Sequence, residues 1–449
     1  MSYFLGLGLF VRSAIPASLR NIPTTGQEVA RFLSFTILLG ISINHLLMLL
    51  VHNLRVSFII GAFFSLVGFL YAIFIVRNFF GRYFRLGRNI SVAVVATVFI
   101  FIVIIMNTRL GWDSQYIWFF HGKMIYFNNG LYQDAGWSHP AYQFSHVDYP
   151  KLIAILAAQF ACLTGTWNDY LPRLSLLILL VPALLGVMSF SGKSKISFVY
   201  LYLMVFFSLN EYTTNGYMDA YLAIYVSLSL LFLWRWVRNE VLDDFLSAFA
   251  YITIIPLMKN EGMLYLVSIL LNVLMSYLVL KNKRHLLLSV FRASAFRYMS
   301  FILFLNIILW SWIKYSWNLK NDLNLGFASI KLIIGRIGDG SIFYVLRMMV
   351  TNVNIGISIS LLLFAVLMSV RSRVFAFKDI LFTITVTSIY FAGIFLIYMS
   401  TPHDLFWHLS SSTYRTMMPV NMSIITATYI VLTTLDTSVD QLHHNDFVN

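Results

Sequence analysis

The stretch ISVAVVATVFIFIVIIMNTRLGWDSQYIW, residues 90–118, joins a long apolar run to a lone carboxylate. Residues 90–107 carry no charged side chain, and about twenty consecutive apolar residues are enough to cross a bilayer. Asp113 follows shortly after this run, among Gly111, Trp112 and Tyr116. The stretch therefore predicts a transmembrane helix that leads into a loop with an acid near the membrane surface.

Composition places the whole chain among membrane proteins. Of its 449 residues, 59% are hydrophobic and only 11% are charged, and the mean hydropathy is +0.78. A soluble domain usually carries about 25% charged residues, so the composition excludes an ordinary soluble enzyme. Apolar windows of membrane-spanning type recur along the chain, at residues 29–51, 56–76, 90–107, 168–190, 196–210, 219–236, 243–257, 262–280, 297–315, 352–370, 379–399 and 419–435.

These windows predict an all-α polytopic membrane protein with about twelve transmembrane helices. They form one expected transmembrane domain, residues 29–435, because no hydrophilic stretch is long enough for a separate domain. Residues 1–28 lack the basic region that opens a signal peptide, so we expect a cytosolic or interfacial segment there. Residues 436–449 are expected to form a cytosolic tail.

Lysine and arginine predict the orientation of the chain, because cytosolic loops are enriched in them. The basic segments 77–88, 192–195, 281–284 and 371–378 are assigned to the cytosol, together with both termini. This assignment accounts for the pI of about 9.6, so nucleic-acid binding is not invoked. The opposite, outer side then holds residues 108–167, 211–218, 258–261, 316–351 and 400–418. The single cysteine, Cys162, excludes an intramolecular disulfide.

Several acids on the outer side stand at the expected helix ends. Asp113 follows the third span, Asp219 opens the sixth, and Glu261 opens the eighth. Ionisable groups at membrane depth are costly and normally face a cavity or a partner. A helix cap or a solvated helix end would explain each acid taken singly. Their common side and their apolar surroundings favour one shared site.

The first outer loop, residues 108–167, contains two apolar, aromatic segments compatible with helices. We expect both to be juxtamembrane helices that lie in the interface and guide a lipid-borne substrate towards Asp113. The alternative is that residues 150–165 form an ordinary span, but this segment is short and would break the alternation of sides. Trp112, Tyr116 and Trp118 are expected to anchor the loop at the interface or to stack against a sugar ring.

The order of these motifs resembles the GT-C superfamily of integral membrane glycosyltransferases. The motifs are Asp113, HVDYPKL (146–152), NDYLPR (168–173), NGYMDAYLA (215–223), KNEG (259–262) and SSTYRTMMP (411–419). More narrowly, the chain is similar to the bacterial branch that includes protein O-mannosyltransferase-like enzymes and the lipid A aminoarabinose transferase. The resemblance covers roughly residues 90–280 and is only topological over 281–400. Relatives often carry two adjacent acids in the first loop, whereas Ser114 follows Asp113 here, so Asp148 or Asp219 would supply the second acid.

The resemblance implies roles for individual residues. Asp113 would be the catalytic base, taking a proton from the acceptor hydroxyl. Four basic residues are candidates to bind the donor phosphate: Arg415, Lys259, Arg173 and Lys151. Acceptor, donor or metal contacts are assigned to His146, Asp148, Tyr149, Asp219, Glu261 and His403. The sequence requires no cofactor, although a Mg²⁺ or Mn²⁺ ion held by Asp113, Asp148 and Asp219 would suit oxygen ligands.

The implied function is an inverting glycosyltransferase that moves a hexosyl or pentosyl unit from a polyprenyl phosphate to an acceptor hydroxyl. The acceptor would be a glycan, a glycolipid or a protein, and the partners include membrane lipids. The expected location is a bacterial inner membrane, with the site facing the periplasm. A polytopic transporter or lipid flippase is one alternative, although the chain lacks the repeated halves and midplane charges typical of transporters. A non-catalytic membrane subunit of envelope glycan assembly is another, in which the carboxylates would tolerate substitution.

Overall fold

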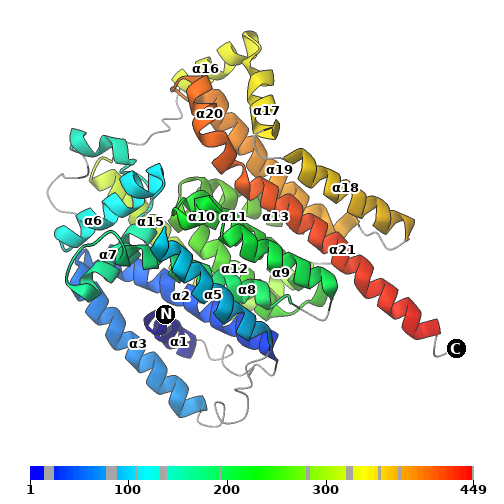
Figure 1. The fold of residues 1–449 in the computed structure, drawn as a ribbon, viewed down its shortest axis with the longest axis horizontal. Helices are drawn as coiled ribbons and strands as arrows, with labels where there is room; N and C mark the ends of the chain where they lie inside the picture. Colours follow the sequence, from blue (N-terminus) through cyan, green and yellow to red (C-terminus); the bar gives the residue numbers. More distant parts are fainter. Residues whose placement is uncertain are drawn as a thin grey trace.

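The fold was analysed in a computed structural model of the chain. It describes residues 1–14, 25–76, 88–107, 110–131, 137, 139–191, 194–279, 284–319, 327–351, 355–372 and 377–446. The described residues form helices joined by short turns, and their only β-type pairing is an isolated bridge between Asn53 and Gly130 (Figure 1). The basic segments 77–88 and 281–284 lie almost wholly outside the described residues.

The helices follow one another along the chain as α1 (Ser2–Ser13), α2 (Gly26–Val51), α3 (Leu54–Val76), α5 (Arg88–Met106), η1 (Ser114–Trp118), α6 (Phe119–Phe127), η3 (Pro140–Ser145), α7 (Leu152–Thr164), η4 (Leu171–Leu174), α8 (Ser175–Met188), α9 (Lys195–Ser208), α10 (Glu211–Thr214), α11 (Met218–Asn239), α12 (Leu242–Met258), α13 (Glu261–Val279), α14 (Arg284–Arg292), α15 (Ser294–Ser316), α16 (Phe327–Gly338), α17 (Ser341–Thr351), α18 (Ile355–Arg371), α19 (Phe377–Ser400), α20 (Leu405–Thr416) and α21 (Met418–Asp446).

The helices confirm an all-α membrane protein. Among the described residues, 7 helices are long and apolar enough to cross a membrane, or up to 8 if the bent pair α17–α18 counts as one span. Each apolar window of the sequence coincides with a helix. The helices at the windows 196–210 and 243–257 are α9 and α12, and they have 14 and 17 residues. At 1.5 Å per residue these are shorter than the hydrocarbon core of about 30 Å, so twelve spans stay a prediction.

Helix α11 is the central helix of the bundle. Every residue from Met218 to Leu233 is buried, because α8, α12, α19 and α21 surround it. A helix that is apolar on all sides is stable only when other helices or lipid cover every face. The buried hydroxyl groups on α11 are bonded internally; for example, the Tyr225 hydroxyl donates to the Leu179 carbonyl oxygen at 2.9 Å. The side chains at the two ends of α11 are therefore held in place by the packing.

Polar side chains tie α2 to its neighbours inside the apolar core. The amides of Asn44 and Gln159 exchange two hydrogen bonds, of 3.0 and 2.8 Å, and so join α2 to α7. The next residue, His45, links α2 to α15, because its Nδ1 lies 2.7 Å from Asn306 Oδ1. Such bonds hold helices together where lipid offers no hydrophobic driving force.

Helix α1 is packed between α2 and α3 (Figure 1). A cytosolic or interfacial location for residues 1–28 stays a prediction. Glycines allow this close approach. A Cβ added at Gly8 would collide with the Thr36 carbonyl of α2, and one added at Gly68 would collide with the Gly6 carbonyl of α1. Small residues at such crossings let helix backbones touch. Residues 15–24 of the predicted segment lie outside the described residues.

Charged side chains occupy both ends of the central helices and leave the middle apolar. At one end, Asp244 Oδ1 accepts from Arg31 at 2.8 Å and from Arg235 at 2.7 Å. At the other end, Asp219 pairs with Lys259. Asp219 and Arg235 both lie on α11, and their separation in sequence corresponds to about 24 Å along the helix. Two charged layers thus bracket an apolar slab close to the thickness of a bilayer core.

The first outer loop contains the two expected helices, α6 and α7, which pack against each other. Residues Leu152–Gln159 of α7 are buried beneath α6 and over the ends of α2 and α3. Helix α7 is therefore mostly covered by protein. Its predicted location in the membrane interface stays a prediction. Its 13 residues extend about 20 Å, which also argues against an ordinary span.

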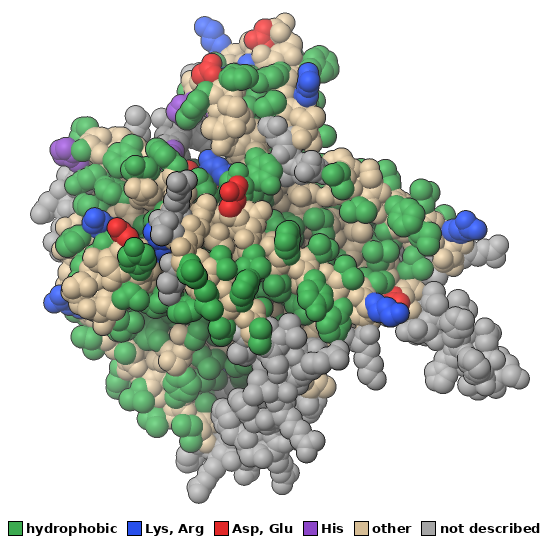
Figure 2. Space-filling view, in the orientation of Figure 1, with side chains coloured by type: hydrophobic (Ala, Val, Ile, Leu, Met, Phe, Trp, Pro, Cys, Tyr) green, Lys and Arg blue, Asp and Glu red, His purple; other side chains and the backbone are tan. Residues whose placement is uncertain are grey.

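Helices α16 and α17 form a second projection on the same side, and they pack on α19 and α20 (Figure 1). Arg336 of α16 donates to the carbonyl oxygens of Tyr398 and Thr401 at 2.8 and 2.9 Å, and so caps the end of α19. The surface is hollowed between this projection and the lobe of α6 and α7, with charged side chains at its margin (Figure 2).

We predict that Gly8→Ala and Gly40→Ala destabilise the protein, because each new methyl group would meet the backbone of the neighbouring helix. Overpacking of this kind costs about 1–3 kcal/mol. The measurement is the thermal unfolding temperature of the purified protein in nanodiscs. Gly335→Ala is the control, since nothing lies within 4 Å of its added Cβ and alanine favours a helix. Equal melting of all three variants would contradict the α1 packing.

Candidate functional site

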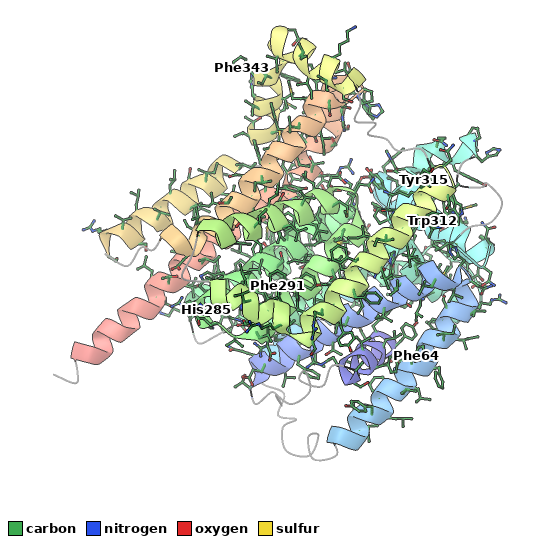
Figure 3. The ribbon with its side chains drawn as sticks, turned by 180° about the vertical axis from the view of Figure 1, so that it is seen from behind. Phe64, His285, Phe291, Trp312, Tyr315 and Phe343 are labelled. Carbon is green, nitrogen blue, oxygen red and sulfur yellow. The ribbon has the colours of Figure 1, made fainter. Side chains whose placement is uncertain are left out.

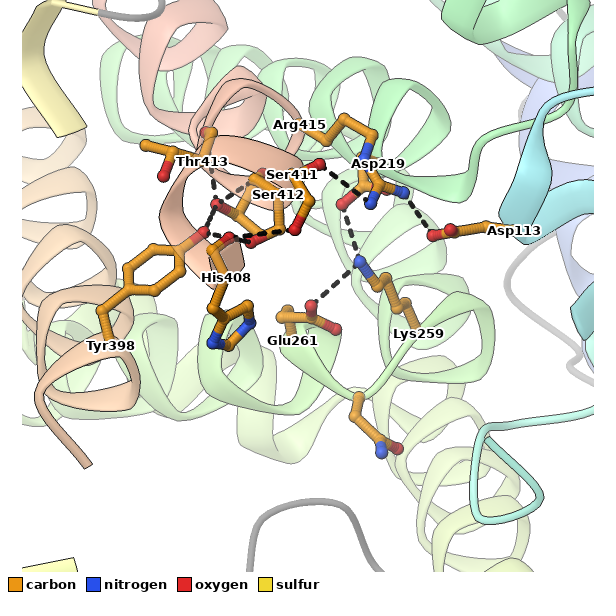
Figure 4. Close-up of polar contacts among 12 residues, drawn as sticks. Asp113, Asp219, Lys259, Glu261, Tyr398, His408, Ser411, Ser412, Thr413 and Arg415 are labelled. Atoms are coloured by element: carbon orange, nitrogen blue, oxygen red, sulfur yellow. Dashed lines mark hydrogen bonds and ion pairs between the residues drawn. The ribbon is translucent and has the colours of Figure 1, made fainter. Parts of the chain in front are cut away.

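Five charged residues from four segments of the chain meet at the N-terminal end of α11, and we call them the charged cluster (Figure 4). They are Asp113, Asp219, Lys259, Glu261 and Arg415. The segments that carry them are the first outer loop, the start of α11, the turn between α12 and α13, and the last turn of α20. Arg415 and Asp113, separated by 302 positions in the sequence, form an ion pair.

A π-helical turn positions Asp113. This residue directly precedes the turn Ser114–Trp118, and the chain reaches it through Gly111. The glycine lies flat against the Tyr217 ring, which a Cβ at position 111 would strike. The Trp112 backbone N–H donates to the Tyr217 hydroxyl at 3.0 Å. π-Helical turns occur often at functional sites. The two residues before Asp113 both contact Tyr217, Gly111 at the ring and the Trp112 backbone N–H at the hydroxyl.

Arg415 is oriented by three contacts. Its Nη1 donates to Asp113 Oδ2, and its Nη2 donates to the Ser411 carbonyl oxygen at 3.3 Å. The guanidinium carbon lies 4.8 Å from the centroid of the Tyr217 ring, within the range of a cation–π interaction. Tyr217 therefore supports both partners of the ion pair. Its ring lies against the Arg415 guanidinium, and its hydroxyl accepts from the backbone N–H of Trp112, the residue before Asp113.

Lys259 is enclosed by two carboxylates. It has extended backbone angles between α12 and α13, and its Nζ donates to Asp219 Oδ1 at 2.8 Å and lies 2.9 Å from Glu261 Oε1. The side chains of Lys259 and Asp219 are only 6% and 3% exposed. Burial disfavours the ammonium ion, but the Asp219 and Glu261 carboxylates outweigh it and raise the pKa of Lys259 above its usual value. Lys259 is therefore charged at neutral pH.

The charged cluster holds three acids and two bases, so its formal charge is one negative. Arg415 binds Asp113 through Oδ2. The other oxygen, Oδ1, has no hydrogen-bond partner within the described part of the chain. The buried Glu261 Oε2 is likewise unpartnered among the described residues. Chemically, the arrangement offers an available carboxylate oxygen beside a guanidinium and a buried ammonium ion. Such a set can accept a proton at one point and stabilise negative charge at another.

Asp148 is linked to the charged cluster through the side-chain amide of Asn260. Its Oδ2 accepts from Asn260 Nδ2 at 2.7 Å, and Asn260 stands between Lys259 and Glu261 in the turn. The three acids proposed to hold a cation thus have different partners, because Arg415 binds Asp113 and Lys259 binds Asp219. Among the described residues, no group of three or more His, Cys, Asp or Glu side chains is placed to hold a metal ion. A divalent cation therefore stays a prediction.

Arg173 lies beside the loop that leads to Asp113, without a direct contact to the charged cluster. It stands in η4, and its Nη1 donates to the Asn107 carbonyl oxygen at the end of α5. The guanidinium carbon lies 5.7 Å from the Tyr170 ring centroid. This bond anchors the end of α5, and the phosphate-binding role of Arg173 stays a prediction.

Lys151 lies in a separate buried group with His121 and Ser145. The Ser145 hydroxyl donates to the Tyr142 carbonyl oxygen at 2.6 Å, so its oxygen accepts from His121 Nε2 at 3.1 Å. His121 Nδ1 is then left to accept from Lys151 Nζ at 3.0 Å. The ammonium also lies 4.5 Å from the centroid of the Trp137 ring. Lys151 therefore links α6, η3 and the start of α7, and its phosphate-binding role stays a prediction.

The remaining candidates form aromatic contacts around these groups. His146 has a left-handed backbone conformation and stacks on Tyr149, with ring centroids 4.9 Å apart. Tyr149 in turn stacks on Trp118 at 5.5 Å. Trp118 is buried, so it neither anchors the interface nor meets a sugar. His403 lies on the surface near the start of α20, with its ring 5.7 Å from that of His408.

Two residues of the site were not singled out from the sequence. Tyr217 stands beneath Arg415, and Asn260 binds Asp148. Both lie inside motifs that we quoted, NGYMDAYLA and KNEG, so proximity to a candidate acid was the available signal. His121 had no such signal, because a histidine in an apolar helix has no marked sequence context.

We predict that Lys259→Met destabilises the protein strongly, because Asp219 and Glu261 would lose their shared cation inside the bundle. Removing one partner of a buried ion pair costs about 3–5 kcal/mol. The measurement is the free energy of unfolding from chemical denaturation in nanodiscs. The double variant Lys259→Met/Asp219→Asn should recover part of the loss. Lys123→Met, at an exposed position of α6, should change little, and an equal effect at both lysines would contradict the pairing.

The buried Lys151 predicts a pH-dependent contribution to stability. Burial holds the pKa of its ammonium group well below the usual value, although the Asp148 charge opposes this. Between that lowered pKa and the unfolded value of about 10.4, the unfolded chain binds one proton more than the folded protein. The free energy of unfolding of the wild type should therefore rise with pH relative to Lys151→Met, by at most about 1.4 kcal/mol per pH unit.

The measurement for Lys151 is chemical denaturation of both proteins at several pH values between neutrality and about pH 10. Lys123→Met is the matched control, because its exposed side chain should leave the slope of the wild type unchanged. A constant difference between wild type and Lys151→Met across this range would refute the prediction.

Comparisons with protein-family models, with curated proteins and with solved structures gave no match to this chain. The resemblance of its motifs to the GT-C superfamily therefore stays a prediction.

Proposed function

We propose that the protein is an inverting glycosyltransferase that transfers a sugar from a polyprenyl phosphate to an acceptor hydroxyl. One observation carries the proposal: the ion pair between Asp113 and Arg415, which joins a potential base to a potential phosphate ligand. The segments that meet there carry the motifs that resemble the GT-C superfamily, in the order that the resemblance requires. We place the site on the extracytoplasmic face of a bacterial plasma membrane, in accordance with the distribution of lysine and arginine.

In the proposed reaction the acceptor oxygen attacks the anomeric carbon and forms the new glycosidic bond. The bond between that carbon and the phosphate oxygen breaks, so the configuration inverts and polyprenyl phosphate leaves. Asp113 Oδ1 takes the proton of the acceptor hydroxyl, a role typically worth about 10²–10⁴-fold in rate. The leaving phosphate retains the electron pair and needs a cation beside it.

Arg415 is the proposed cation for the leaving phosphate, since a guanidinium matches two phosphate oxygens with two N–H groups. In the free protein its charge is already neutralised by Asp113. Donor binding would therefore exchange partners: the phosphate takes the guanidinium, and Asp113 is released towards the acceptor. Lys259 stays between its two carboxylates and supplies a fixed positive charge below the phosphate.

Helix α20 suits a donor with an apolar tail. It carries Arg415 in its last turn, and it exposes the rings of Phe406 and Trp407 in its first turn. A polyprenyl phosphate laid along this helix would meet apolar rings with its tail and a guanidinium with its head. Membrane lipids would solvate the rest of the chain.

We predict that Asp113→Asn lowers the release of polyprenyl phosphate by about 10²–10⁴-fold, because the amide cannot accept the proton. The assay supplies several polyprenyl-phosphate sugars to the protein in nanodiscs and follows free polyprenyl phosphate by mass spectrometry. Thermal unfolding of each variant confirms that it is folded.

Asp169→Asn is the matched control, because Asp169 is an exposed acid on the same side of the protein and belongs to no part of the charged cluster. It should retain the wild-type rate. Equal release by wild type and Asp113→Asn would remove Asp113 as the base. Absence of both turnover and donor binding in the folded wild type would overturn the proposed function.

A further inference from the structure

Aromatic rings follow the surface of the first outer loop away from Asp113, and we call this row the aromatic track. Its members are Trp112, Tyr116, Phe144, Phe120, Tyr142 and His139. Neighbouring ring centroids lie 5.1, 6.2, 5.3, 5.7 and 5.8 Å apart in that order. The first ring belongs to the residue directly before Asp113.

The rings nearest to Asp113 are open to solvent. Trp112 is 54% exposed, Tyr116 39% and Phe144 46%. The hydroxyls of Tyr116 and Tyr142 make no hydrogen bond within the described residues, so they are available to a ligand. Large exposed aromatic surfaces that are rimmed by polar groups usually mark a binding site.

The aromatic track is held rigid from below. Phe120 lies on α6, whereas Tyr142 and Phe144 lie on η3. The buried bond between His121 and Ser145 joins these two elements, and Lys151 fixes His121 from α7. Trp112 is fixed through its backbone bond to Tyr217. A surface that is already ordered loses little conformational entropy when a ligand binds.

The chemistry of the aromatic track matches a carbohydrate. Sugar rings present C–H groups on their faces, which pack on aromatic faces, and hydroxyls on their edges, which bond to groups such as the Tyr116 and Tyr142 hydroxyls. Five of the six rings are uncharged, and only His139, at the far end, can carry a positive charge. The track therefore favours a neutral glycan over a phosphorylated or otherwise acidic one.

We infer that the aromatic track binds a neutral glycan and is the acceptor subsite of this protein. The role of this glycan as the acceptor rests on the proposed function, whereas the binding of the glycan does not. A chain of sugars on the track would end beside Trp112 and present a terminal hydroxyl to Asp113 Oδ1. The acceptor would thus be a glycan or the glycan part of a glycolipid.

Aromatic rings also gather at membrane interfaces, where they anchor proteins without binding a ligand. Trp312, Tyr315 and Phe343 are exposed rings on α15 and α17 that point away from the bundle (Figure 3). Each is at least as exposed as the residue of its own type in the aromatic track. They therefore serve as matched controls for Trp112, Tyr116 and Phe144.

The experiment measures binding of short neutral oligosaccharides, from glucan, mannan, galactan and chitin, to the protein in nanodiscs. Saturation-transfer NMR identifies bound sugars, and titration gives the dissociation constant. We expect at least one series to bind, and Trp112→Ala and Phe144→Ala to weaken it about tenfold each, or about 1.4 kcal/mol. Trp112→Phe should restore most of the affinity, and Trp312→Ala, Tyr315→Ala and Phe343→Ala should bind like the wild type.

Three results would overturn the inference: no oligosaccharide binds, the track variants bind normally, or the control variants lose as much affinity. A track that serves only as a membrane anchor would give no sugar-dependent signal in the wild type or in Trp112→Ala. The proposed function is tested separately by donor cleavage. Glycan binding with neither donor cleavage nor donor binding would retain this surface and reject the transferase, whereas donor cleavage without glycan binding would do the reverse.

Discussion

The enclosure of Lys259 between Asp219 and Glu261 is the interaction on which the outer end of the bundle depends. A charge inside an apolar helix bundle is tolerated only when it is paired and hydrogen-bonded, and breaking such a pair costs several kcal/mol. The pairing therefore holds the start of α11 against the turn between α12 and α13, within 2.8 Å at the contact. The positions of the other cluster residues follow from this fixed junction.

Tyr217 connects the start of α11 to the first outer loop and to α20. It precedes Asp219 by two residues, so its ring has a definite position once α11 is held. The ring supports the Arg415 guanidinium on one side and leaves room for a glycine at position 111 on another. A functional pair is effective when rigid neighbours hold its members, and here one side chain contacts both halves of the Asp113–Arg415 site.

The outer side of the molecule divides the tasks of the proposed transferase between two regions. Helix α20, on which α17 of the projection packs, supplies Arg415 and exposed apolar rings, which suit a lipid-borne donor. The first outer loop supplies Asp113 and the aromatic track, which suit a water-soluble glycan chain. The charged cluster lies where these regions meet, so donor and acceptor would approach from different directions, and their reacting atoms would meet at the Asp113–Arg415 pair.

The sequence by itself determined that the chain is an all-α membrane protein, because apolar windows of span length can be satisfied in lipid only by helices. It also placed the acids Asp113, Asp219 and Glu261 at helix ends, since short polar turns interrupt the windows there. Only the tertiary structure decided which charges pair. Lys259 and Arg415 were preferred as phosphate ligands over Lys151 and Arg173, but the sequence did not show that Lys151 is buried beside His121 or that Arg173 bonds to the end of α5. Burial of α1 and α7 was equally hidden, because an apolar helix has the same composition whether lipid or protein covers it.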